Sequence, residues 1–128
     1  MGVYVISPSD KGGRLWKPPP ELVDLTKPLS PMQFNEIFCL SHPEIGSLGI
    51  GAAQVSDFDE HLESLAFLDG DSELVNSIDS RLRNSMTRAC GMEQPDLHWD
   101  RLPVWEETPE YINIPLILWL YNLARGWG

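Results

Sequence analysis

The chain has 128 residues, of which 42% are hydrophobic, so it is long enough for one domain with its own core and too short for several. Nineteen acidic side chains against nine basic ones give a formal charge of −10, and residues 28–80 contain no lysine or arginine. A surface this acidic repels nucleic acid and anionic membranes, which excludes both as partners.

The cysteine content and the hydropathy pattern indicate the compartment. Cys39 and Cys90 stand far apart, and no secretory signal precedes the first apolar run. The most apolar segment, residues 114–124, is shorter than the roughly 20 residues that a membrane-spanning helix needs. We therefore expect a cytoplasmic protein in which this segment is a buried helix.

Two short apolar runs predict strands, and a long loop follows the first. Residues 3–6 are apolar without a break, which is typical of a strand buried on both faces. Residues 11–28 are rich in proline and predict a long loop. Residues 47–53 predict the second strand. Both strands run into small or polar residues, a kind of turn that lets a ligand's phosphates approach the backbone.

Capping signals predict two helices in the middle of the chain. Ser30, Pro31 and Gln33 form a capping box that begins a helix over residues 31–40. Ser56 is the expected N-cap of the next helix, whose first turn is acidic. The apolar side chains that we expect on the inner face of this second helix are Phe58, Leu62 and Leu65.

The second half of the chain is predicted to be mainly helical. A helix is expected over residues 72–88, with Gly91 as its C-terminal stop, and residues 92–109 form an irregular connection anchored by tryptophans. The apolar face of this helix carries Val75, Ile78, Leu82 and Met86. Asn113 caps the last helix, whose apolar face must pack on another element. That face carries Ile114, Ile117, Leu118 and Tyr121.

This order of elements predicts an α/β protein with parallel strands. Two parallel strands alone would leave both edges open and their faces uncovered. We therefore expect the chain to be a piece of a larger sheet or barrel.

The two strand-to-loop transitions resemble the last two β/α units of aldo/keto reductases. In particular, the likeness is to one bacterial branch of predicted oxidoreductases, and it is carried by the runs ISPSDKGG, KPPPELVDLTKPLSPMQFN, SHPE and GAAQVSDFDEHL and by the tail YINIPLILWLYNLA. It covers most of the chain. The resemblance implies an incomplete (β/α)8 (TIM) barrel fragment, with the last two β/α units in residues 1–70 and a C-terminal helical extension in residues 71–128.

The resemblance also implies that the chain supplies loops that bind NADP(H). The residues expected at the nicotinamide and pyrophosphate are Ser7, Pro8 and Ser9, and those expected over the phosphates are Lys11, Gly12 and Gly13. The adenosine phosphate is expected against the backbone of Gly51, Ala52 and Ala53, and adenine near Asp57, Glu60 and His61. Small residues suit this task because they let backbone N–H groups close on an anion.

Three positions depart from many relatives, which have an aromatic residue at Ile6, a basic residue at or beside Gln54 and asparagine at His61. Because the basic residue would bind the 2′-phosphate, Gln54 leaves NAD(H) as a second candidate cofactor. The proton-relay residues of the family lie earlier in the barrel. We therefore expect no catalytic residue in this chain, and no carbonyl reduction by it alone.

Other kinds of site are less well supported by the sequence. The pairs Cys39 with His42 and Cys90 with His98 lack the spacing of known zinc ligands, so we expect no metal. A serine nucleophile in the first loop lacks the strand-elbow-helix motif. The acidic cluster at residues 57–63 suits a helix N-terminus better than a metal site.

A non-catalytic role is the alternative function. An exposed sheet edge and apolar helices would bind another chain, which would be either the missing barrel half or a second copy. On this interpretation the chain is an interaction protein, and it associates with itself when isolated.

Overall fold

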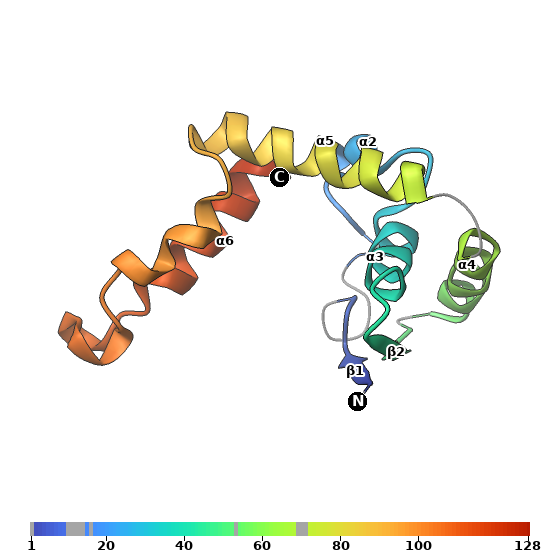
Figure 1. Cartoon of the computed structure of the whole chain (residues 1–128), viewed down its shortest axis with the longest axis horizontal. Coiled ribbons are helices and arrows are strands. Elements are labelled where there is room, and N and C mark those ends of the chain that lie inside the picture. The colour runs from blue at the N-terminus through green and yellow to red at the C-terminus, as the bar shows by residue number, and fades with distance from the viewer. Residues whose placement is uncertain (1, 10–14, 16, 53, 69–71) are drawn as a thin grey trace. The chain divides into compact units, whose positions relative to one another are not determined.

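Figure 1 presents a computed structural model of the chain, which describes residues 2–9, 15, 17–52, 54–68 and 72–128, with the side chains of residues 96–98 left out. The chain divides into two units, Met1–Asp79 and Ser80–Gly128. The division expected from the sequence follows residue 70.

The first unit contains a parallel pair of short strands, β1 (Val3–Ile6) and β2 (Ile45–Gly49). The register places Val3 opposite Ile45 and Ile6 opposite Gly49, with an irregularity after Val3. Both strands were predicted, although β2 begins and ends earlier than residues 47–53. The parallel pairing was also predicted and is confirmed.

Two helices connect the strands, and one of them was missed. Helix α3 (Pro31–Leu40) begins as predicted: Gln33 N donates to Ser30 Oγ at 3.1 Å, and Ser30 N donates to Gln33 Oε1 at 3.0 Å. Helix α2 (Pro20–Thr26) lies where we expected a loop. The loop prediction is wrong there because Pro20 occupies the first turn, where a missing N–H costs nothing, and no further proline follows until the helix has ended.

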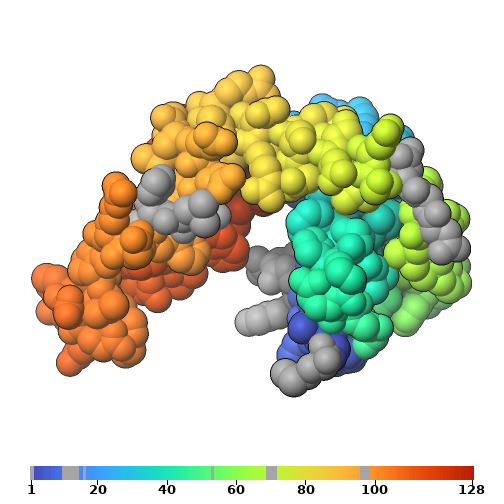
Figure 2. Space-filling view, in the orientation of Figure 1, coloured from blue at the N-terminus to red at the C-terminus, as the bar shows by residue number. Residues whose placement is uncertain are grey.

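Helix α4 (Val55–Ser64) exposes the face that we expected to be buried. Its apolar side chains Phe58, Leu62 and Leu65 are 55%, 65% and 52% exposed, whereas Asp57 and His61 are buried. Its N-cap is Gln54 rather than Ser56. Both predictions are therefore wrong. The buried face is polar because α4 packs against α3 (Figure 2), whose side chains bond to it, and the N-cap lies at Gln54 because Gln54 N donates to Asp57 Oδ2.

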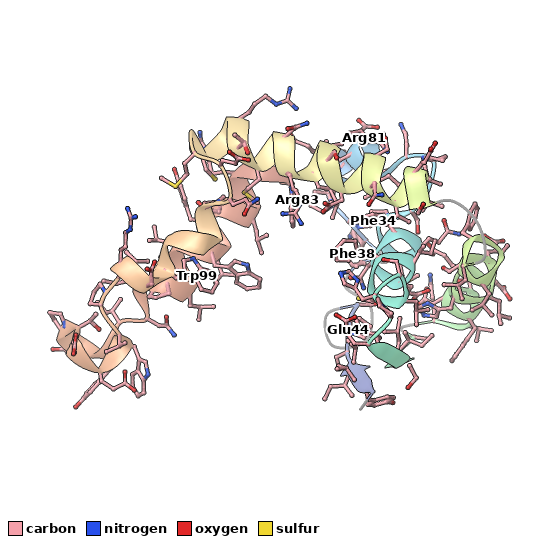
Figure 3. All side chains as sticks on the ribbon, in the orientation of Figure 1. Phe34, Phe38, Glu44, Arg81, Arg83 and Trp99 are labelled. Carbon is pink, nitrogen blue, oxygen red and sulfur yellow. The ribbon has the colours of Figure 1, made fainter. Side chains whose placement is uncertain are left out.

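The core of the first unit comes from α3, from the residues just before it and from the first turns of α5 (Ser72–Cys90). Its buried hydrophobic side chains are Leu29, Met32, Phe34, Ile37, Val75 and Ile78. The Phe34 and Phe38 rings stand one turn apart on α3, with centroids 5.6 Å from each other (Figure 3). Isolated helices of this length are only marginally stable in water, so the helices of the first unit depend on the burial of these side chains.

The second unit joins the last turns of α5 to α6 (Ile114–Gly126). Leu82 and Met86 are buried, so all four apolar residues predicted on the inner face of α5 are confirmed. Ser85 Oγ donates to Gly126 O at 2.8 Å. A side chain at Gly126 would place its Cβ 2.9 Å from Met86 Sδ, so a glycine is needed at this close approach.

The apolar helix α6 is held at its C-terminal end and exposed along its middle. Trp127 Nε1, just beyond the helix, donates to Leu82 O at 3.1 Å, and Asn113 Oδ1 caps the other end by accepting from Leu116 N at 3.0 Å, as predicted. The burial that we expected is wrong for the run Leu116, Ile117, Leu118, Trp119, Leu120 and Tyr121, which is 36% to 57% exposed. The two described hydrogen bonds that join this end of the chain to α5 lie at Gly126 and Trp127, and the other described elements leave the middle of α6 partly exposed.

The expected fold class, an incomplete (β/α)8 barrel fragment, is wrong. The described residues form mostly helices with two short parallel strands, so the chain is a small helix-rich α protein. The misleading feature is β1, whose apolar run suggested a strand buried on both faces. In the structure Val3, Tyr4 and Ile6 are 47%, 62% and 70% exposed, which barrel strands are not.

Candidate functional site

The loops that follow β1 and β2 leave the strand pair at the same edge. Ile6 lies opposite Gly49, and Ser7 N donates to Gly49 O at 3.0 Å. Ser7 has a left-handed backbone with φ of 54°, which turns the chain sharply at the end of β1. The parallel pairing therefore places the end of β1, with Ser7, beside the end of β2, as expected of two parallel strands.

The first loop is anchored by α3. Asn35 Nδ2 donates to Pro8 O at 2.8 Å. Ser9 is only 1% exposed, and its Oγ has no hydrogen-bond partner among the described residues. An unpaired buried hydroxyl is costly, so this oxygen is a candidate ligand contact. The predicted phosphate-covering residues Lys11, Gly12 and Gly13 lie outside the described residues.

The second loop leads into the N-terminus of α4. Gly51 and Ala52 are half-buried and Gln54 is exposed, while Ala53 lies outside the described residues. Gln54 N donates to Asp57 Oδ2 at 3.0 Å. The carboxylate of Asp57 therefore occupies the positive end of α4, where the resemblance suggested an anionic ligand nearby.

A polar seam joins α3 to α4, and it takes up the other residues expected near adenine. The seam consists of three side-chain pairs, Ser30–Glu60, Gln33–Glu63 and Glu36–His61. Of the three pairs, Gln33–Glu63 is the most exposed to solvent, and in it Gln33 Nε2 donates to Glu63 Oε2 at 3.3 Å. A role in binding adenine stays a prediction for Asp57, Glu60 and His61, and it would require these internal bonds to open.

The Glu36–His61 pair is the buried end of the polar seam. Glu36 and His61 are 4% and 5% exposed, and His61 Nδ1 is bonded to Glu36 Oε1. Burial raises the pKa of the Glu36 carboxyl, while hydrogen bonding from Ser64 and the charge and hydrogen bond of His61 act in the opposite direction. His61 Nε2 is buried and has no partner among the described residues.

A cavity of about 160 Å³ lies beside this pair. Its polar wall is formed by Glu36, His61 and Ser64. Its apolar wall comes from β2, the end of α3 and the turn after α4, and includes Leu40, Leu48, Ile50, Leu65 and Leu68. The cavity therefore combines an apolar lining with one imidazole nitrogen that lacks a hydrogen bond.

Sequence reasoning missed Glu36 and Ser64. One signal was present: Glu36 stands near the apolar residues Phe34 and Ile37 and is the only charged residue of α3. A carboxylate in such a position needs a partner, since an unpaired buried charge is costly. The partner, His61, lies 25 residues further along the chain, and only the packing of α4 on α3 brings the two together.

In comparisons with known proteins, no family model, no curated protein and no solved structure matches the chain. The likeness to aldo/keto reductases therefore remains an expectation.

Neither a membrane span nor a metal cluster is found in the part of the chain that the structure describes. Every helix there is too short or too polar to cross a bilayer. No group of three or more His, Cys, Asp or Glu side chains within those same residues is arranged to hold a metal ion.

Proposed function

We propose that the chain supplies the nicotinamide- and phosphate-facing loops of a nicotinamide dinucleotide site in an oxidoreductase, with NADP(H) as the preferred cofactor and NAD(H) as the alternative. One observation supports this most directly: β1 and β2 are parallel, so the loops that begin at Ser7 and at Ile50 leave the strand pair at the same edge. Ligands of open parallel sheets bind at this edge, outside the carboxyl ends of the strands.

The contacts proposed for the phosphates are local hydrogen bonds. Ser9 Oγ is buried and unpaired among the described residues, so a phosphate oxygen would supply its missing partner. Gly51 and Ala52 are small enough for the backbone to approach an anion closely. The positive end of α4 is not part of the proposal, because the Asp57 carboxylate already occupies it.

The chemistry itself is assigned to another chain or segment. Hydride transfer to a carbonyl needs a proton donor beside the reacting oxygen, and the resemblance places the relay residues outside this chain. The isolated chain is expected to bind the dinucleotide weakly and to reduce no carbonyl. Its cytoplasmic location stays a prediction.

Replacing Ser9 tests the proposed phosphate contact. In Ser9→Ala, NADPH affinity should fall about tenfold, the effect of one lost hydrogen bond to a charged group. The stability of the unliganded chain should stay the same or rise, since the substitution removes an unpaired buried hydroxyl. Fluorescence quenching titrations measure the affinity, with Ser80→Ala as the control because Ser80 is exposed on α5. Unchanged NADPH binding in Ser9→Ala would remove this residue from the site.

Replacing Gln54 tests the choice of cofactor. Gln54 is exposed beside the second loop, and Gln54→Arg should tighten NADPH more than NADH. The reason is that a guanidinium pairs with the 2′-phosphate in a bidentate manner and has no such partner on a plain ribose. An equal effect on both cofactors would place Gln54 away from the 2′-phosphate.

A second candidate function, binding another protein chain, is favoured by the apolar surface of the first unit. Val3 and Ile6 on β1 and Phe58 and Leu62 on α4 are all 47% exposed or more. Exposed apolar side chains and an open strand edge are typical of an interface. Sedimentation velocity tests this function: self-association should increase with concentration and weaken in Ile6→Lys. A monomer at all concentrations would exclude a second copy as the partner.

A further inference from the structure

One buried atom beside the cavity next to the polar seam lacks a hydrogen bond among the described residues. His61 is 5% exposed and lines the cavity, and its Nε2 has no hydrogen-bond partner among the described residues. Buried polar atoms in native proteins nearly always have a partner, because leaving one unpaired costs about 1–3 kcal/mol. A molecule bound in the cavity is a candidate for that partner.

The protonation of His61 narrows the choice of that partner. When Glu36 is ionised, its Oε1 accepts from Nδ1, so in the neutral imidazole the proton lies on Nδ1 and Nε2 is an acceptor. In the imidazolium both nitrogens donate. A hydroxyl group both donates and accepts, so it can pair with Nε2 in either state.

The charge and size of the cavity narrow the choice further. The buried Glu36 carboxylate forms part of the wall and would repel an anion. Most of the remaining wall is leucine and isoleucine, which favours an apolar body. The volume of about 160 Å³ is close to that of an apolar cavity of about 150 Å³ that takes up benzene.

We propose that this cavity is a binding site for a small neutral molecule with an apolar body and a single hydroxyl group, of which phenol is the simplest aromatic example. The hydroxyl bonds to His61 Nε2, and the ring lies against Leu40, Leu48 and Leu65. Glu36 orients the imidazole through Nδ1. This site shares His61 with the residues expected near adenine but uses none of the phosphate-facing loop residues 7–9 and 51–52. It goes beyond the proposed dinucleotide function, and its test with phenol is separate from the test with NADPH.

Titration of the full chain with phenol and toluene tests the role of the hydroxyl. Toluene has nearly the same shape and lacks the hydroxyl, so it should bind at least about fivefold more weakly than phenol, the effect of one hydrogen bond. Benzoate, an anion of similar size, should not bind. In a spectrum of ¹⁵N-labelled histidine, phenol should shift the His61 Nε2 resonance much more than the Nδ1 resonance.

Two matched variants test whether His61 makes the contact. In His61→Asn the amide nitrogen lies near the position of Nδ1 and can still donate to Glu36, but no nitrogen reaches the position of Nε2, so the preference for phenol over toluene should disappear. In His42→Asn the preference should remain, since His42 bonds Phe38 O through Nδ1 and does not line the cavity.

The outcomes separate the alternatives. Equal affinity of the unmodified chain for phenol and toluene, absence of phenol binding, or a shift that spares Nε2 would overturn the proposal. The spectral result is independent of whether His61→Asn folds, and the result with NADPH does not affect it.

Discussion

Helices α4 and α5 are both amphipathic, but α5 buries its apolar face and α4 buries its polar face. On α5 the apolar side chains Val75 and Ile78 are 8% and 0% exposed. On α4 the polar side chains Asp57 and His61 are 2% and 5% exposed, while Leu62 is 65% exposed. An amphipathic pattern therefore shows which residues share a face, but it does not show which face is covered. The neighbouring element decides that.

The neighbour of α4 is α3, and its sequence explains the difference. Ser30, Gln33 and Glu36 recur at intervals of three residues, so they follow one side of α3 and meet α4 there. A helix that packs on such a row gains more from its own polar side chains than from leucines, since buried polar groups need partners. The apolar face of α4 is then left outward.

The largest expected effect is the loss of one member of the buried pair. His61→Leu leaves the Glu36 carboxylate buried without its partner and should lower the free energy of unfolding by about 3 kcal/mol or more. The double variant Glu36→Leu/His61→Leu should recover most of this loss, because it removes both charged or polar groups together. Urea denaturation measures both. A single variant as stable as the unmodified chain would mean that the pair is not buried in solution.

The next effect compares apolar residues of the two helices directly. Ile78→Ala on α5 should cost about 3 kcal/mol, since Ile78 is fully buried. Phe58→Ala on α4 should change stability by less than about 0.5 kcal/mol, since Phe58 is 55% exposed. Thermal or urea unfolding distinguishes the two. If Phe58→Ala costs as much as Ile78→Ala, the face of α4 bearing Phe58 is covered in solution.

A smaller effect compares the starts of α3 and α4. Ser30→Ala removes the N-cap of α3 and a bond to Glu60, and it should cost about 1 kcal/mol. Ser56→Ala should stay within about 0.5 kcal/mol, because Gln54 rather than Ser56 precedes the first turn of α4. Circular dichroism during denaturation checks both variants. A larger loss in Ser56→Ala than in Ser30→Ala would reverse the assignment of the caps.

The last prediction concerns the dependence of stability on pH. Burial raises the pKa of Glu36 above its ordinary value of 4.5, so the folded state binds this proton more readily than the unfolded state. The contribution of Glu36 is therefore fully present below pH 4.5 and is lost as pH rises through the raised pKa. The free energy of unfolding of the unmodified chain, compared with that of Glu36→Gln, should fall as the pH rises from 4.5 through the raised pKa of Glu36. Above that pKa it should stay constant.

The control for this prediction accounts for the groups that face Glu36. His61 and Glu60 on α4 and Cys39 on α3 interact with it, and the pKa of the Cys39 thiol is raised by burial and then by the Glu36 charge. Repeating the titration in His61→Gln and in Glu36→Gln/His61→Gln separates the change due to Glu36 from that due to the imidazole. A difference that stays constant with pH would show that the carboxyl is solvated.

The sequence by itself determined the elements whose signals are local. The N-cap at Ser30, the apolar stripe of α5, the Gly91 stop and the cap at Asn113 are set by residues within one or two turns, and each was predicted correctly. The placement of Ser7 beside the end of β2 also followed from two short strands and the parallel pairing expected of them.

Tertiary structure alone decided the fold class, the buried face of α4 and the cavity at His61. These depend on which surfaces meet, and the residues involved stand far apart: Glu36 and His61 are 25 residues from each other. An apolar run such as residues 3–6 carries the same local signal whether its strand ends up covered on both faces or exposed. Burial is a property of the neighbours that a segment acquires, and local sequence does not contain those neighbours.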